Sequence, residues 1–240
     1  MPETFFYWAV ILAAGFLQGL TGFGFVLISL PLLNLFLPLK TIIPLVCLLA
    51  LLVSLTLSVQ LRSHVEWKSI LLLLVATLPA VPAGVYLLKH IPAQYLSIAL
   101  GAIMVAFTAH QLLARPVQRD LGTGWTLFTG LLSGALAGSI GAGGPPVIVY
   151  SALRTWDKNR AKATLALYFV VSGLFVSSTH ALSGLITGEV IRLFLNALPA
   201  LIAGIVLGTA TYTRISDKGY RRLALVLVLV LGGLMLFRNL

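Results

Sequence analysis

The stretch "GFLQGLTGFGFVLISLPLL", residues 15–33, places four glycines and a proline in an apolar run whose only strongly polar side chain is Gln18. It lies within a longer apolar stretch, residues 5–37. As one helix, that stretch would be about 50 Å long, whereas the hydrocarbon core of a bilayer is about 30 Å thick. We therefore predict a break in the helix at Thr21–Gly24, where glycine allows the backbone to take positive φ.

The composition of the chain is that of a membrane protein. Hydrophobic residues make up 59% of its 240 positions, charged residues only 9%, and the mean hydropathy is +1.04. Soluble domains carry about 25% charged residues. We therefore expect an all-α polytopic membrane protein that has the lipid bilayer as a partner. The net charge of +10 comes from short basic clusters between apolar stretches. Such clusters signal membrane topology and not a nucleic-acid surface.

Hydropathy divides the chain into eight apolar stretches with no soluble domain between them. A helix needs about 20 apolar residues to span a bilayer, so six of the stretches suit a single crossing. The first and the fifth are too long for one straight helix. The eight stretches cover residues 5–37, 41–61, 69–88, 93–114, 123–153, 163–188, 190–213 and 220–237.

The chain contains an internal repeat. The glycines at 15, 19, 22 and 24 recur 119 residues later, at 134, 138, 141 and 143, in "SGALAGSIGAGGPPVIVY", residues 133–150. In addition, "LPAVPAG" at 78–84 recurs 120 residues later as "LPALIAG" at 198–204. Two anchors with nearly one period indicate a duplication. We expect two homologous membrane repeats, 1–118 and 119–240, in one transmembrane domain, with the second break at Gly141–Pro146.

Each broken stretch can either cross the membrane once or form a hairpin that returns to the side of entry. Single crossings would divide the Lys and Arg residues outside the stretches into 10 and 6, whereas hairpins would divide them into 12 and 4. Cytoplasmic loops are enriched in Lys and Arg, so the hairpin is favoured. Each half then has a hairpin and three crossings. This odd number predicts inverted repeats with both termini outside the cytoplasm.

Inverted halves would bring the two breaks toward the membrane midplane from opposite faces. Unwound backbone persists in lipid only where it is buried in protein or lines a cavity. The half-helix after each break directs free N–H groups and a positive dipole end toward the gap, which suits an anion. We expect positive φ at Gly24 and Gly143. The alternative role for glycine is close helix packing, which we prefer for the G-x-x-x-G positions Gly15, Gly19, Gly134 and Gly138.

Both glycine-rich stretches and the following "AKAT", Ala161–Thr164, resemble the TauE/SafE family of sulfite exporters, also called toluene-sulfonate uptake permeases. The resemblance covers the chain end to end. It implies a transporter that moves small sulfur-containing or carboxylate anions, such as sulfite and organosulfonates, across the bacterial inner membrane. The chain departs from several relatives after "AKAT", where it reads "LALYFVVSG" in place of further polar or basic residues.

Polar groups at the breaks are the first candidates for contacts to a small anionic substrate. Gln18 supplies amide donors, and Thr21 and Ser139 supply hydroxyls, although a hydroxyl can instead bond back to a backbone carbonyl. Tyr168 and Ser172 are further hydroxyl candidates, with packing as the alternative. The predicted substrate-binding residues are Gln18, Thr21, Gly22, Phe23, Gly24, Ser139, Gly141, Gly143, Gly144 and Pro145.

Charged side chains suggest how anions are attracted and how transport is driven. Lys40 and Lys162 each follow a glycine-rich stretch, where they either attract anions or extend to the headgroups. All six acidic residues lie at or near stretch ends, which disfavours a carboxylate relay. His180 lies well inside an apolar stretch and is the candidate proton relay. Its alternative role is that of a neutral imidazole bonded across helices to the cluster Ser177–Thr179.

The sequence contains no pattern that indicates an enzyme. It has neither H-E-x-x-H nor paired aspartates, so we predict no catalytic residue, metal or cofactor. It has no P-loop, which leaves the substrate gradient or a cotransported proton as the energy source. Two other functions stay open, an integral membrane enzyme and a non-transporting membrane subunit. A homo-oligomer is also open.

Overall fold

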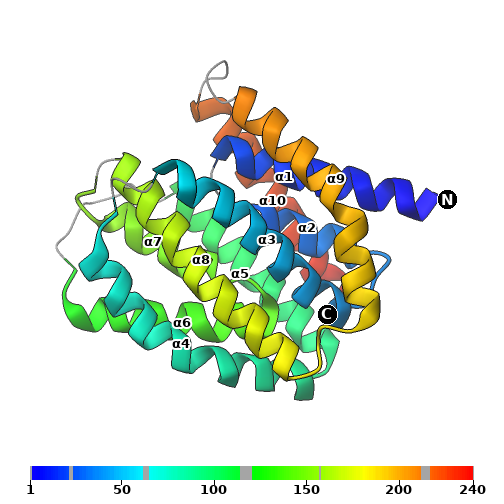
Figure 1. The fold of residues 1–240 in the computed structure, drawn as a ribbon, viewed down its shortest axis with the longest axis horizontal. Helices are drawn as coiled ribbons and strands as arrows, with labels where there is room; N and C mark the ends of the chain where they lie inside the picture. The colour runs from blue at the N-terminus through cyan, green and yellow to red at the C-terminus, as the bar shows by residue number, and fades with distance from the viewer. Residues whose placement is uncertain are drawn as a thin grey trace.

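The computed structural model of the chain describes residues 2–21, 24–61, 65–113, 121–156, 158–211 and 217–239. The regular elements in these ranges are ten α-helices (Figure 1). The first five are α1 (Pro2–Thr21), α2 (Phe25–Leu33), α3 (Leu39–Leu61), α4 (Trp67–His90) and α5 (Ala93–Leu113). The others are α6 (Thr123–Ile140), α7 (Gly144–Leu153), α8 (Lys158–Leu182), α9 (Gly188–Thr211) and α10 (Asp217–Asn239). The predicted all-α class is confirmed for these residues.

Eight apolar stretches give ten helices because two of the stretches are broken. The first stretch forms α1 and α2, and the fifth forms α6 and α7. The first break follows Thr21, as predicted. The second covers only residues 141–143, which is shorter than predicted, because Pro145 and Pro146 lie in the first turn of α7. Proline is tolerated there, since the first N–H groups of a helix have no acceptor within it.

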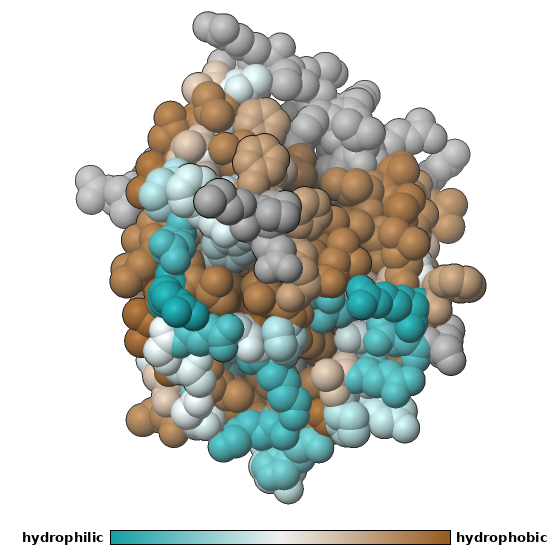
Figure 2. All heavy atoms as spheres, turned by 90° about the vertical axis from the view of Figure 1, so that its right-hand side faces the viewer, coloured by the Kyte–Doolittle hydropathy of each residue, from teal (hydrophilic) through white to brown (hydrophobic). Residues whose placement is uncertain are grey.

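The described chain is a multi-pass membrane protein. Five helices, α3, α4, α5, α8 and α9, are long and apolar enough to cross a bilayer, and the apolar parts of α1, α7 and α10 are shorter. Large apolar side chains such as Val75 and Phe237 are exposed on the surface, where lipid would cover them. Figure 2 views the molecule from the right-hand end of Figure 1 and shows polar side chains gathered in the lower part of that end, among hydrophobic surfaces.

The helices pair across the two halves of the chain. α1 packs along α9, α6 along α4, α3 against α8 and α5 against α10 (Figure 1). If α1–α5 are matched in order with α6–α10, the pair α1 and α9 corresponds to the pair α6 and α4. The pairs α3 with α8 and α5 with α10 correspond to themselves. The most extensive helix contacts therefore join an element of residues 1–118 to an element of residues 119–240.

Glycines allow very close contact between α1 and α9. A Cβ atom added to Gly19 would lie 2.9 Å from the carbonyl oxygen of Ile205 and 3.1 Å from the Cα atom of Gly208. Near the other end of the pair, Tyr7 Oη donates a hydrogen bond of 2.8 Å to the carbonyl oxygen of Leu193. These contacts follow the same order along both helices, so α1 and α9 are parallel.

The pair α4 and α6 repeats this arrangement. A Cβ atom added to Gly134 would lie 2.9 Å from the Cβ atom of Ala80, and one added to Gly84 would lie 3.0 Å from the Cα atom of Gly138. Ala80 and Gly84 belong to "LPAVPAG", so the two anchors of the sequence repeat are the two sides of one helix contact. The predicted packing role of Gly15, Gly19, Gly134 and Gly138 is confirmed.

The other two pairs are antiparallel. The N–H of Glu66, which follows α3, donates to Thr164 Oγ1 near the start of α8 at 3.1 Å. Gln94 Nε2, near the start of α5, donates to the carbonyl oxygen of Asn239 at the end of α10 at 2.8 Å. In each of these pairs, one helix therefore begins where its counterpart ends.

Contacts between the ends of helices define the two ends of the molecule. At one end, Lys40 Nζ donates to the carbonyl oxygen of Lys89, and Lys89 Nζ donates to that of Ser183, at 2.9 and 3.1 Å. At the other end, a nitrogen of Arg160 lies 3.5 Å from a carboxylate oxygen of Glu66. In Figure 1 the first end is on the right, where α1 begins, and α2 runs back toward it. In the same view, α7 runs back to the left, where α6 begins.

Gly138→Ala should lower the stability of the protein, because the added methyl group meets the backbone of α4 at Val81, Gly84 and Val85. Overpacking of this kind costs about 1–3 kcal/mol. Gly124→Ala, in the same helix but with nothing near its Cβ position, is the matched control and should be neutral or stabilising. Thermal unfolding in detergent measures both, and equal melting temperatures would contradict the packing role.

Candidate functional site

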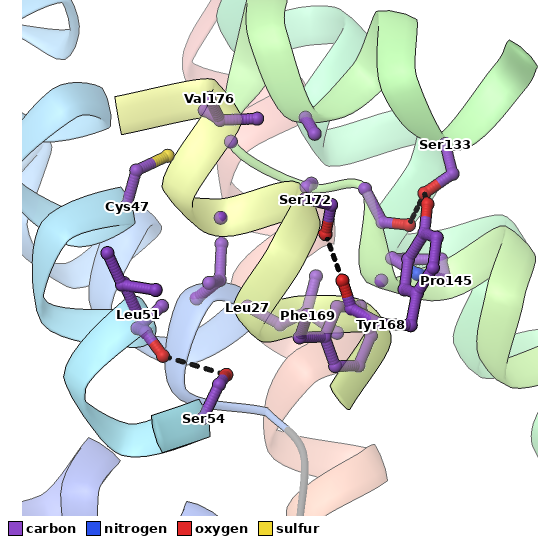
Figure 3. A pocket seen from close by; sticks show the side chains of 18 of the residues that line it. Leu27, Cys47, Leu51, Ser54, Ser133, Pro145, Tyr168, Phe169, Ser172 and Val176 are labelled. Carbon is purple, nitrogen blue, oxygen red and sulfur yellow. Dashed lines mark hydrogen bonds between the residues drawn. The ribbon is translucent and has the colours of Figure 1, made fainter. Parts of the chain in front are cut away.

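The two breaks meet at one cavity in the middle of the helix bundle. The cavity has a volume of about 110 Å³, and its wall comes from α1, α2, α3, α6, α7 and α8 together with both breaks (Figure 3). The predicted site residues that line it are Gln18, Gly24, Gly141, Gly143, Gly144 and Pro145. Residues that are far apart in the sequence, one set from each half, therefore line one cavity.

The cavity lies halfway along the two central helices. On α3 its wall includes Ala50 and Leu51, and on α8 it includes Phe169 and Ser172. Ala50 is the middle residue of Leu39–Leu61, about 17 Å from either end at the rise of an α-helix. A hydrocarbon core is about 30 Å thick, so a bundle that spans it would hold this cavity near its midplane.

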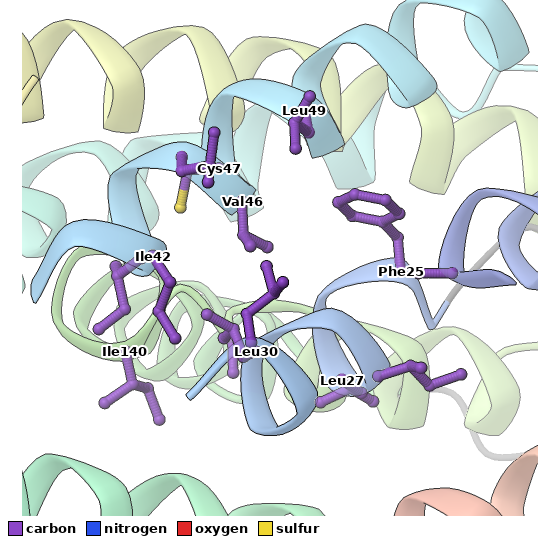
Figure 4. Close-up of a cluster of buried hydrophobic side chains, with 14 of the residues drawn as sticks. Phe25, Leu27, Leu30, Ile42, Val46, Cys47, Leu49 and Ile140 are labelled. Carbon is purple, nitrogen blue, oxygen red and sulfur yellow. The ribbon is translucent and has the colours of Figure 1, made fainter. Parts of the chain in front are cut away.

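The first break is held by a turn and by a side chain. Gly24 has a φ of 107°, in the left-handed region that favours glycine. The Phe25 N–H then donates to Gln18 Oε1 at 2.8 Å, so Gln18 on α1 binds one of the free N–H groups at the start of α2. Figure 4 shows Phe25 and Leu30 of α2 within a buried hydrophobic cluster that includes Ile42 of α3. Apolar packing therefore holds α2 against α3.

The backbone conformation at the second break differs from that at the first. Gly141 has a φ of 70°, whereas Gly143 has a φ of −72°, so the predicted positive φ at Gly143 is wrong. Gly143 is needed because space is short: an added Cβ would lie 2.7 Å from both the Ala137 Cβ atom and the Ser133 carbonyl oxygen. The left-handed turn occurs at Gly141 because the helix ends there, at its C-cap.

A chain of hydroxyl groups connects three helices to the second break. Tyr168 Oη donates to Ser133 Oγ at 2.8 Å, and Ser133 Oγ donates to the carbonyl oxygen of Gly143 at 2.6 Å (Figure 3). Thr77 Oγ1 lies 2.8 Å from Tyr168 Oη and also bonds the carbonyl oxygen of Gly130 at 3.0 Å. Tyr168 and Ser133 line the cavity, so this chain forms a polar part of its wall.

Sequence reasoning missed Ser133 and Thr77. Their position in the sequence could have identified them, because each precedes one of the small-residue motifs that recur in the chain. Ser133 precedes Gly134, and Thr77 precedes "LPAVPAG". Tyr168 was a candidate, and its hydroxyl faces the second break. Ser172 lines the cavity, but its Oγ donates to the Tyr168 carbonyl oxygen at 2.7 Å.

Other predicted residues lie elsewhere. Ser139 Oγ bonds back to the carbonyl oxygen of Ala135 at 2.6 Å, which is the alternative considered for it. Lys40 lies at one end of the molecule, where its Nζ donates to the Lys89 carbonyl oxygen. Gly22 and Phe23, and the side chains of Thr21 and Lys162, lie outside the described residues.

The cavity wall carries no Lys, Arg, His, Asp or Glu among the described residues. Its polarity comes from hydroxyls, from the Gln18 amide and from the backbone at the starts of α2 and α7. The first N–H groups of a helix have no acceptor within the helix, which applies here to Gly143 and Gly144 and to Val26 and Leu27, all in the wall. The cavity is therefore neutral in formal charge and positive in backbone potential.

His180 is fully buried beside the second break. Its Nε2 atom lies 3.1 Å from the carbonyl oxygen of Gly138, one turn before the break. The alternative considered for His180, a bond to the cluster Ser177–Thr179, is wrong, since its Nε2 contacts Gly138 and Thr179 Oγ1 bonds the Phe175 carbonyl oxygen. Among the described residues, His180 Nδ1 and Ser177 Oγ have no hydrogen-bond partner.

Comparison with known proteins gives one family. The family model described as sulfite exporter TauE/SafE matches residues 7–235. No curated protein and no solved structure matches the chain.

Tyr168→Phe should lower the free energy of unfolding by about 0.5–1.5 kcal/mol, because it removes the hydroxyl that bonds Ser133 and Thr77. The matched control is Tyr95→Phe, since Tyr95 is 62% exposed on the surface. Chemical or thermal unfolding in detergent compares the two variants. Equal stability would mean that the hydroxyl chain does not hold α4, α6 and α8 together.

Proposed function

Because the chain belongs to the TauE/SafE sulfite exporter family, with a match that covers residues 7–235, we propose that it is a secondary transporter of small anions that binds them in the central cavity. The substrates are organosulfur anions, such as sulfite and sulfonates, or small carboxylates. The observation that carries this proposal is the meeting of two broken helices, each with its N-terminal end in the wall of one cavity. Transporters of several folds bind substrates at such discontinuous helices.

The proposed binding site uses the backbone for charge. The N–H groups of Gly143 and Gly144 come from one half, and those of Val26 and Leu27 come from the other. Helix N-termini of this kind bind anions without a cationic side chain. The absence of Lys and Arg from the described wall favours release as well as binding, because the anion leaves no unpaired buried charge behind. Gln18, Ser133 and Tyr168 supply polar contacts beside the backbone groups.

We propose that the halves 1–118 and 119–240 are inverted repeats. Two helices related by a two-fold axis are antiparallel when the axis is perpendicular to them. The pairs α3 with α8 and α5 with α10 are counterparts of this kind, and both are antiparallel. If these helices cross the bilayer, the axis lies in the membrane plane, which is the arrangement of inverted repeats.

We also propose an orientation for this arrangement in the bacterial inner membrane. If α2 and α7 return as hairpins, 12 Lys and Arg residues belong to the end near Glu66 and Arg160, and 4 belong to the end near Lys40 and Lys89. The positive-inside rule makes the first end cytoplasmic. Both termini then lie outside the cytoplasm. Lys40 adds positive charge at the outer end, and Lys162 at the inner end, where each can attract anions.

Single cysteines test this orientation in a Cys47→Ala background. Lys68→Cys and Thr155→Cys should both be shielded from an impermeant thiol reagent in intact cells, whereas Gln94→Cys should be labelled. If each broken stretch crossed the membrane once, positions 68 and 155 would lie on opposite sides. Labelling of only one of those two would therefore rule out the hairpins.

Gly24→Ala and Gly143→Ala test the binding site. The first places a methyl group in open space but strains a positive φ, and the second crowds Ala137 and Ser133 beside the anion-binding N–H groups. Both should weaken binding of sulfite or methanesulfonate at least about tenfold, or 1.4 kcal/mol. Isothermal calorimetry measures affinity, a melting curve separates lost binding from lost folding, and Gly124→Ala is the control. Wild-type affinity in both folded variants would refute the site at the breaks.

A further inference from the structure

His180 is held by one ring nitrogen and leaves the other without a partner. Its Nε2 atom lies 3.1 Å from the Gly138 carbonyl oxygen. A carbonyl only accepts, so Nε2 carries the hydrogen and Nδ1 presents a lone pair. The side chain is 0% exposed, and Nδ1 has no hydrogen-bond partner among the described residues. A buried acceptor without a partner destabilises the fold, and a bound proton or water would remove that cost.

A second unpartnered group lies on the same face of α8. Ser177 precedes His180 by three residues, a spacing that places both side chains on one side of a helix. Ser177 Oγ is also buried and has no partner in the described part of the chain. A hydroxyl can donate or accept, so it can stabilise a protonated or a neutral imidazole. Two unpartnered polar groups therefore mark one buried site.

This site lies between the central cavity and one end of the molecule. Val176, one turn before His180, lines the cavity. Ser183, one turn after it, accepts a hydrogen bond from exposed Lys89 at the end of the molecule. The proposed topology makes this the outer end. A proton that moves along α8 from the outside would reach His180 before it reached the substrate.

The charges near His180 offer no acidic partner. The titratable groups on the elements packed against this end of α8 are Lys40 and Cys47 of α3 and Tyr86, Lys89 and His90 of α4. The described part of α6 has none, and Tyr150 and Arg154 of α7 belong to the opposite end of the molecule. Glu189 is an exposed residue in the first turn of α9. An imidazolium at position 180 would therefore need its counter-charge from elsewhere.

The second break supplies both kinds of helix end. The α6 helix ends at Ile140, and the carbonyls of its last turn, Gly138 among them, form a partly negative end that favours a cation. The α7 helix begins at Gly144, and its partly positive end faces the cavity. One break thus suits a protonated histidine on one side and an anion on the other.

We propose, building on the proposed anion transport, that His180 Nδ1 binds a proton that is carried together with the anion. The anion in the cavity provides the counter-charge that the protein lacks, and the buried imidazolium favours the anion in return. Coupling between two binding sites is reciprocal. The position 119 residues earlier is Leu61, so the first half has no equivalent group, and one proton accompanies each anion.

The test measures the affinity for methanesulfonate, which stays ionised, between about pH 5 and pH 8. In the wild-type protein the affinity should rise up to about tenfold for each unit of decreasing pH, as linkage to one proton requires. His180→Gln, whose amide can still donate to Gly138, should bind with an affinity that does not change with pH. His90→Gln, at an exposed site, should behave as wild type. A flat wild-type profile, or the wild-type slope in His180→Gln, would overturn the proposal.

Nitrogen-15 NMR of the four histidines provides a readout that needs neither transport nor a folded His180 variant. The His180 signal is identified by elimination with His64→Gln, His90→Gln and His110→Gln. We expect its Nδ1 to take up a proton in this pH range when methanesulfonate is present. If Nδ1 stays unprotonated with and without the anion, the proton site is wrong even where the anion binds. If methanesulfonate does not bind at any pH while Nδ1 still titrates, the proton site at His180 is supported. The proposed anion site in the central cavity is then wrong for this sulfonate.

Discussion

The structure depends on the close contact between small-residue faces of α1 with α9 and of α6 with α4. Lipid tails are as apolar as leucine, so the hydrophobic effect gives helices in a bilayer little reason to associate. Close backbone approach provides that reason through packing, and only glycine and alanine permit it. Gly19 against Gly208 and Gly138 against Gly84 fix where each broken helix lies. The breaks follow directly after these contacts, and for that reason they meet at one cavity.

Positions 119 residues apart in the two halves of the chain carry different polar groups. Gln18, which binds the start of α2, has Ala137 at the position 119 residues later. Ser133 and Tyr168, which form the hydroxyl chain at the second break, have Ala14 and Leu49 at the positions 119 residues earlier. The two sides of the cavity therefore carry distinct polar groups. The proposed substrate would meet an amide on one side of the cavity and hydroxyls on the other.

Much of the fold was predictable because glycine and proline restrict or free the backbone locally. The broken stretches and the packing role of Gly19 and Gly138 followed from spacing alone. The choice of partner did not, since an exposed glycine face fits any other small-residue face, and only the three-dimensional contacts pair α1 with α9. The hydrogen-bond partners of the hydroxyl groups were harder still to predict. Ser139 bonds a carbonyl of its own helix, whereas Ser133 bonds the carbonyl of Gly143 across the break. Nothing in the adjacent residues distinguishes these two serines.

The exchange of partners between the halves also dictates an order of assembly. Tyr7 and its acceptor Leu193 are 186 residues apart, so when α1 leaves the ribosome its partner does not yet exist. Until α9 has been made, the glycine face of α1 has no packing partner and is covered by lipid or by an insertion factor. The glycine face of α6 meets no such delay, because α4 has already been made when α6 emerges. A nascent chain that stops before α9 thus has the contact between α4 and α6 complete, while the glycine face of α1 still lacks its partner. Quality-control proteases would encounter that uncovered face of α1.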